Sequence, residues 1–100
     1  MKIIFRTTIK IIPGKMTEYM EVEKRIKAVT SRYEMPYWTR RYKPFTGESV
    51  HTIVYDTEWD SLSSLEAAYE KISSDPAGEA AMANMAECIV SHDSELYTLM

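Results

Sequence analysis

Hydrophobic and polar residues alternate in four short stretches of the chain, at residues 2–12, 37–42, 49–57 and 91–99. A period of two is typical of β-strands that have one buried face. In the first stretch Phe5 lies on a mostly apolar face, whereas Arg6 lies on the other. We therefore expect four strands, the first of which packs under helices through its Phe5 face.

Two longer stretches carry apolar residues at every third or fourth position, which is the spacing of an amphipathic helix. In the first, at residues 15–33, Glu23 and Lys27 are spaced to form an ion pair on a solvated surface. The second is interrupted at Asp75-Pro76, where the aspartate is a good helix cap and the proline a good first helical residue. We expect one continuous helix and one broken helix.

The order of these elements along the chain is β-α-β-β-α-β, and it occupies nearly all of the 100 residues. This order predicts a ferredoxin-like α+β fold, in which a four-stranded antiparallel sheet has its helices on one face only. A chain of this length forms one hydrophobic core, so we expect residues 1–100 to be a single domain.

The two faces of the third predicted strand differ in the size of their side chains. We expect the small β-branched set to pack under the helices and the larger set to lie on the helix-free face. The small set is Val50, Thr52 and Val54, and the larger set is His51, Ile53 and Tyr55. In the second strand the same alternation puts Trp38, Arg40 and Tyr42 on the helix-free face.

Several segments of the chain resemble the NIPSNAP-like branch of the dimeric α/β-barrel superfamily. They are VHTIVYD at residues 50–56, Trp59 with DSL at 60–62, LEA at 65–67, DP at 75–76 and ELY at 95–97. The resemblance implies the strand order 4-1-3-2 and a homodimer in which two protomers meet face to face. Related branches include cofactor-independent monooxygenases, haem-degrading monooxygenases and proteins with no assigned activity.

The helix-free face predicts the same assembly on physical grounds. An uncovered sheet face with several aromatic side chains is larger than the apolar patches that monomers usually expose. We expect a second copy of the chain to cover it, in a homodimer or a larger homo-oligomer whose two sheets enclose a barrel. The alternative is a monomer whose C-terminal strand or a loop folds over the face.

Six residues are candidates for a site on this face. We expect His51 to act as a general base, because imidazole exchanges a proton near neutral pH. Aromatic walls and guanidinium groups suit a planar, acidic or phenolic ligand. The predicted substrate-binding residues are Arg6, Trp38, Arg40, Tyr42 and Tyr55. In the alternative interpretation, His51 and the arginines form structural hydrogen bonds and ion pairs.

These residues predict an oxygenase-like enzyme that needs no tightly bound cofactor and acts on a small aromatic or polar molecule. The alternative is a non-catalytic homodimer that binds a small molecule or another protein. The haem-degrading relatives carry a histidine on the second helix and an asparagine on the first strand. Here the only asparagine is Asn84, and residues 62–72 contain no histidine, which argues against haem.

Other classes of partner are disfavoured by charge and by motif. The net charge is −3 and the third strand lacks the basic-glycine-aromatic signature, so we expect no nucleic-acid binding. No metal site is expected, because His51 and His92 fall on strands separated by another strand. No segment is apolar enough for a signal peptide or a membrane span, and the single cysteine, Cys88, cannot form an internal disulfide. We expect a cytoplasmic protein in which Cys88 is a buried apolar residue.

Overall fold

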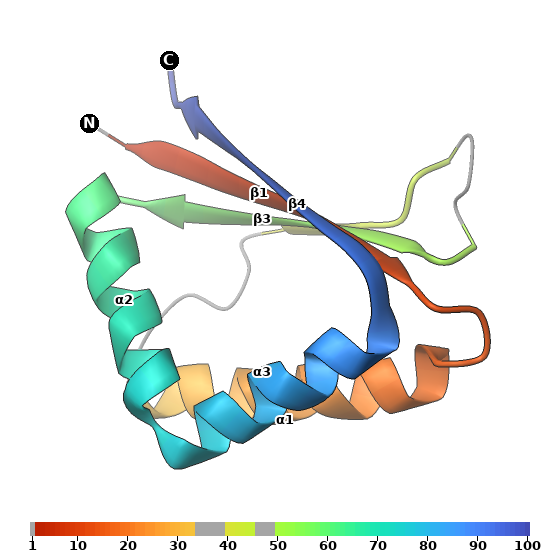
Figure 1. The fold of residues 1–100 in the computed structure, drawn as a ribbon. Helices are drawn as coiled ribbons and strands as arrows, with labels where there is room; N and C mark the ends of the chain where they lie inside the picture. The colour runs from red at the N-terminus through yellow and green to blue at the C-terminus, as the bar shows by residue number, and fades with distance from the viewer. Residues whose placement is uncertain (1, 34–39, 46–49) are drawn as a thin grey trace.

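The computed structural model describes residues 2–33, 40–45 and 50–100. Its elements in chain order are β1 (Ile3–Ile11), α1 (Met16–Arg32), β2 (Arg40–Tyr42), β3 (Thr52–Trp59), α2 (Leu62–Ser74), α3 (Pro76–Cys88) and β4 (Ile89–Thr98) (Figure 1). The predicted order of strands and helices is confirmed, including the break in the second helix. Among the described residues, none of the helices is long and apolar enough to cross a membrane.

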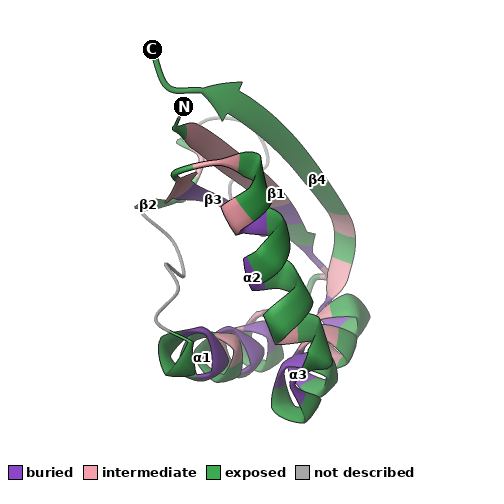
Figure 2. Ribbon diagram, turned by 90° about the vertical axis from the view of Figure 1, so that its left-hand side faces the viewer, coloured by how far each residue is buried: buried purple, intermediate pink, exposed green. Residues whose placement is uncertain are grey.

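The four strands form one antiparallel sheet in the order β2-β3-β1-β4, which is the order that the family resemblance implied. On β1, Thr7 lies opposite Tyr55 of β3 and opposite Ser94 of β4. The helices α1, α2 and α3 lie on the same side of the sheet, so within the described part of the chain its other face is free of helices (Figure 1). β4 forms one edge and is exposed over most of its length (Figure 2).

Local signals place the start of α2 and the break between α2 and α3, and the break falls at Asp75, where the sequence predicted it. Ser61 caps α2 by accepting a hydrogen bond from the backbone of Ser64, whose hydroxyl accepts one in return from Ser61. Asp75 ends α2 and caps α3 by accepting hydrogen bonds from the amides of Ala77 and Gly78. The Tyr33 hydroxyl also donates to Asp75, at 2.6 Å, which ties the end of α1 to this joint.

The core lies between the sheet and the helices (Figure 2). Its central cluster consists of Ile9, Ile11, Tyr19, Ile53, Tyr55 and Cys88. Cys88 is 2 % exposed, so the prediction that it packs as a small apolar residue is confirmed. The Phe5 face of β1 packs under the helices, as predicted.

The predicted faces of the third strand are wrong. Tyr55 and Ile53 lie under the helices, because they are paired with Thr7 and Ile9 of the face that β1 turns toward α1. Alternation assigns residues to two faces but does not say which face is buried. The size argument failed because Tyr55 finds hydrogen-bond partners for its hydroxyl on α1, as described below.

Candidate functional site

A cavity of about 160 Å³ lies between the sheet and the helices. All three helices and the strands β1, β3 and β4 contribute side chains to its wall. Most of this wall is apolar, and five aromatic rings dominate it. These are Phe5, Tyr19, Tyr55, Trp59 and Tyr69. An apolar space of about 150 Å³ is large enough to hold a benzene ring.

The aromatic part of the wall is held together by specific contacts. The rings of Phe5 and Tyr69 meet edge to face, with centroids 5.8 Å apart and an interplanar angle of 81°. The Trp59 indole nitrogen donates to the Thr57 hydroxyl at 2.7 Å, and this hydroxyl donates to the carbonyl of Phe5 at 3.4 Å. These contacts join β1, β3 and α2 around the cavity.

A buried polar network forms one end of the same wall. The hydroxyl groups of Tyr19 and Tyr55 are 2.6 Å apart, and Tyr55 donates a hydrogen bond to the carboxylate of Glu23. The guanidinium group of Arg41 approaches that carboxylate to 3.2 Å from β2. Burial raises the pKa of Tyr19 to about 12, and burial also raises the pKa of Tyr55.

Glu23 was predicted to lie on a solvated surface, and this prediction is wrong, since the residue is 8 % exposed. The spacing between Tyr19 and Glu23 is the signal that could have identified Glu23 as a buried residue. Tyr19 and Glu23 are four residues apart and therefore share one face of α1. Neither Tyr19 nor Glu23 was among the predicted site residues, and neither was His92, which lines the cavity from β4.

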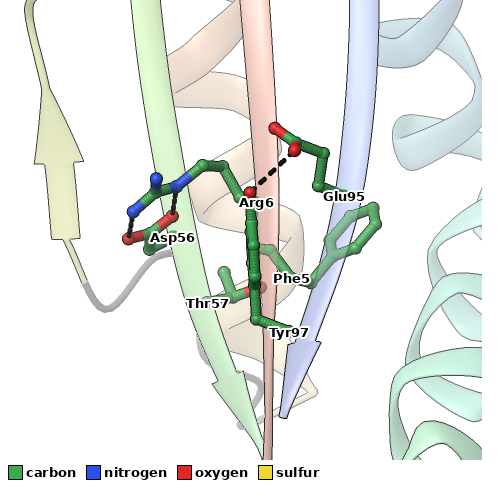
Figure 3. Close-up of polar contacts among 6 residues, drawn as sticks. All are labelled: Phe5, Arg6, Asp56, Thr57, Glu95 and Tyr97. Carbon is green, nitrogen blue, oxygen red and sulfur yellow. Dashed lines mark hydrogen bonds and ion pairs between the residues drawn. The ribbon is translucent and has the colours of Figure 1, made fainter. Parts of the chain in front are cut away.

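On the opposite, helix-free face, three of the predicted substrate-binding residues gather around Asp56. Arg6 donates two hydrogen bonds to Asp56, of 2.8 and 2.9 Å (Figure 3). Arg40 of β2 lies opposite Asp56 of β3 in the register of the sheet. The guanidinium carbon of Arg6 lies 5.8 Å from the centre of the Tyr42 ring. The structure therefore brings Arg6, Arg40 and Tyr42 together, as predicted.

This cluster is more polar than the predicted apolar-aromatic patch. The guanidinium carbon of Arg6 also lies 5.6 Å from the centre of the Tyr97 ring, and Tyr97 donates to Glu95 at 2.7 Å (Figure 3). The hydrogen bond from Arg6 is the main cause that lowers the pKa of Asp56; a hydrogen bond from Tyr42 lowers it further, and burial opposes both. Because its Nε and Nη2 atoms both donate to the carboxylate of Asp56, Arg6 acts here as an ion-pair partner.

The other predicted site residues do not join this cluster. Tyr55 lies under the helices. His51 precedes β3 in a turn and accepts a hydrogen bond at its carbonyl from the amide of Ile11, at 2.7 Å. His51 and Asp56 are five positions apart, which along a strand is about 16 Å. His51 therefore cannot act together with Arg6 within one protomer, and Trp38 lies outside the described residues.

No group of three metal-binding side chains occurs within residues 2–33, 40–45 and 50–100. His92 lies across β1 from Ile53, so it is also remote from the turn that carries His51. The polar groups of the cavity wall are thus tyrosine and threonine side chains and one imidazole, with the buried Glu23 behind Tyr55.

No family model matches the sequence, and no curated protein is similar to it. Solved structures are similar in fold. A NIPSNAP family protein from Agrobacterium tumefaciens has 16 % identity and a TM-score of 0.86, over 100 % of this chain and 94 % of that one. The chain has the NIPSNAP fold. An uncharacterized NIPSNAP domain protein from Burkholderia xenovorans has 16 % identity and a TM-score of 0.82, over 98 % of this chain and 94 % of that one.

The NIPSNAP fold is shared with an oxygenase. SnoaB from Streptomyces nogalater, a cofactor-independent oxygenase, is 15 % identical, with a TM-score of 0.70 over 99 % of this chain and 93 % of that one. The predicted resemblance and the predicted α+β class are both confirmed at the level of the fold. At these identities the likeness concerns the fold alone.

Proposed function

We propose that this chain binds a small planar molecule in the cavity between sheet and helices and oxidises it with dioxygen, without a bound cofactor. The observation that supports this proposal is the cavity itself, which has aromatic walls and a few hydroxyl groups. Such a space holds an aromatic ring by burial, while a small number of polar groups orients it. The similarity of the fold to a cofactor-independent oxygenase agrees with this reaction class.

In this reaction the substrate supplies the electrons. The substrate loses two hydrogen atoms, one from a ring carbon and one from its hydroxyl group, and that ring carbon gains one oxygen atom from dioxygen. The second oxygen atom leaves as water with the two hydrogen atoms. The protein holds the ring, excludes bulk water and accepts the proton that the substrate loses. The cavity offers the imidazole of His92 for this role.

Oxygen uptake with a panel of small hydroxylated aromatic compounds tests the proposal. The matched variants are Ala68→Leu and Ala67→Leu on α2. Ala68 is 5 % exposed and lines the cavity, whereas Ala67 is exposed. We expect Ala68→Leu to reduce the rate at least about tenfold, since it fills the binding space, and Ala67→Leu to have no effect.

Equal rates for the two variants would refute a reaction in this cavity. Ligand binding that depends on Ala68 but is accompanied by no oxygen uptake would instead favour the alternative function, a non-catalytic binding protein. Circular dichroism of both variants checks that the fold is retained.

We also propose that a second copy of the chain covers the helix-free face. This face carries both signs of charge, Arg6 and Arg40 beside Asp56 and Glu95, with the half-exposed ring of Tyr97 among them. A face with both signs can meet its own copy across a twofold axis, because each group finds the opposite charge there.

Light scattering after size exclusion tests this assembly, since one chain has a mass of 11.6 kDa. Tyr97 and Leu62 are 43 % and 48 % exposed, but Leu62 lies at the start of α2, away from the helix-free face. We expect a dimer that Tyr97→Lys weakens and Leu62→Lys does not. A wild-type protein of monomer mass at micromolar concentration would refute the assembly.

A further inference from the structure

The buried network of Glu23, Tyr55 and Tyr19 has a direction. The hydroxyl of Tyr55 has one hydrogen atom, which it donates to the carboxylate of Glu23. The hydroxyl of Tyr19, 2.6 Å from that of Tyr55, must then be the donor in their hydrogen bond. Both hydrogen bonds of this network therefore run from donor to acceptor in the direction from Tyr19 through Tyr55 to Glu23.

This direction decides what Tyr19 can offer to a molecule in the cavity. Tyr19 and Tyr55 both line the cavity, and both hydroxyl hydrogen atoms are already engaged. The oxygen of Tyr19 retains its capacity to accept a hydrogen bond. This end of the cavity thus accepts a hydrogen bond from a ligand but has no tyrosine hydrogen to donate.

The carboxylate of Glu23 is paired with a guanidinium group that is not part of the cavity wall. Arg41 approaches Glu23 from β2, with Nε 3.2 Å from Oε2, and Arg41 is not among the residues that line the cavity. A ligand in the cavity therefore meets the tyrosine end of the network and remains separated from the guanidinium group. An anionic ligand would be repelled by Glu23 without direct pairing with Arg41.

We propose that Glu23, acting through Tyr55 and Tyr19, makes the cavity selective for neutral aromatic molecules that carry a hydroxyl donor. Ethers of the same ring have no hydroxyl hydrogen to donate to Tyr19. Phenolate anions also lack this hydrogen, and their negative charge is repelled by the carboxylate of Glu23. Glu23 is a positioning residue in this scheme, because it does not touch the ligand. The inference depends on the proposed function only in that the cavity must bind an aromatic ring.

Other titratable groups around the cavity require a control. α2 contributes Tyr69 and β4 contributes His92, while the described lining residues of α3, Met82 and Met85, do not titrate. A pH effect on binding could therefore arise from the protein. A probe that does not ionise, with the same ring, reports any such effect separately.

Equilibrium binding of 4-nitrophenol and 4-nitroanisole provides the test. The two probes share a ring and differ in the hydroxyl hydrogen. We expect the wild-type protein to bind neutral 4-nitrophenol about tenfold more tightly than 4-nitroanisole, as one hydrogen bond to a charged network predicts. We also expect 4-nitrophenol to lose affinity as the pH passes through its own ionisation, while 4-nitroanisole keeps its affinity.

Three variants identify the source of the selectivity. In Glu23→Gln the side-chain amide can donate to Tyr55, so the direction of the network is released and the preference should fall below about threefold. Tyr19→Phe removes the acceptor, keeps the bond between Tyr55 and Glu23, and should abolish the preference. Tyr33→Phe is the matched control and should keep the preference, because it removes a tyrosine hydroxyl that is not in the cavity wall and donates to Asp75 at 2.6 Å.

The outcomes separate the inference from the proposed function. Similar affinities of the wild-type protein for the two probes would overturn the selectivity while the cavity remained a binding site. A preference that Tyr19→Phe and Glu23→Gln both retain would overturn the role of the network. Absence of binding for both probes would overturn the cavity as a ligand site, and with it both proposals.

Discussion

Replacement of Gly78 by alanine tests the packing at the joint between α2 and α3. Gly78 is the third residue of α3, and its amide donates to Asp75 at 3.2 Å. A Cβ atom at this position would lie 2.2 Å from the carbonyl oxygen of Ile72, the last turn of α2. Since side-chain carbons essentially never approach other atoms within 3.0 Å, the two helices would have to separate by at least 0.8 Å.

The expected loss of stability follows from two opposing contributions. Alanine is a better helix former than glycine by about 1 kcal/mol. An overpacked site costs about 1–3 kcal/mol, and the upper part of this range applies because the obstacle is backbone and cannot rotate away. We therefore expect Gly78→Ala to lower the free energy of unfolding by about 2 kcal/mol, which corresponds to a fall in Tm of roughly 8–16 °C for a domain of this size.

Urea and thermal unfolding followed by circular dichroism measure this change, with all proteins at one concentration. Ala80 is an exposed residue of the same helix, so Ala80→Gly is the control, and it should lower stability by about 1 kcal/mol through helix propensity alone. A Gly78→Ala protein that is as stable as the wild type, or more stable, would show that the joint yields easily and would refute the packing argument.

Three further results are expected. Because burial raises the pKa of Tyr19 to about 12, the folded state keeps this hydroxyl neutral while the unfolded chain ionises it above about pH 10; urea denaturation should show stability falling from about pH 10 to 12, less steeply in Tyr19→Phe. The pKa of Asp56 is lowered chiefly by Arg6, so the ion pair stabilises the fold above about pH 4 and this contribution is lost as the pH falls through the lowered value. Asp56→Asn should cost about 1 kcal/mol at neutral pH and approach the wild type in acid, and a constant difference across the titration would contradict this. Cys88 should react with a thiol reagent only when urea opens the fold, since it is 2 % exposed; rapid labelling of the native protein would contradict its position in the core.

The order of the elements could be predicted because each has a local cause. The caps at Ser61 and Asp75 are made by side chains within three residues of the backbone groups that they bind. The spacing of apolar residues in residues 15–33 is a property of that helix alone. Interactions of this range are visible in the amino-acid sequence, and the resemblance to NIPSNAP proteins added the strand order.

The candidate site could be predicted only in part, for reasons of geometry. Arg6, Arg40 and Tyr42 were assigned to one face and do meet there. The assignment of Tyr55 was reversed, because its face depends on pairing with Thr7, a residue 48 positions earlier in the chain. The cavity was not predicted, since its wall combines side chains from six elements.

The amino-acid sequence by itself thus determined the order of the strands and helices, the break between α2 and α3 at Asp75-Pro76 and the side of β1 that is buried. These features follow from alternation, helical spacing and capping, which act over a few residues. Only the tertiary structure decided that Glu23 is buried beside Tyr55 and that His51 is remote from Arg6. The physical reason is that hydrogen bonds between α1 and the sheet depend on register and on where the helix crosses the strands, and neither is encoded within a single element.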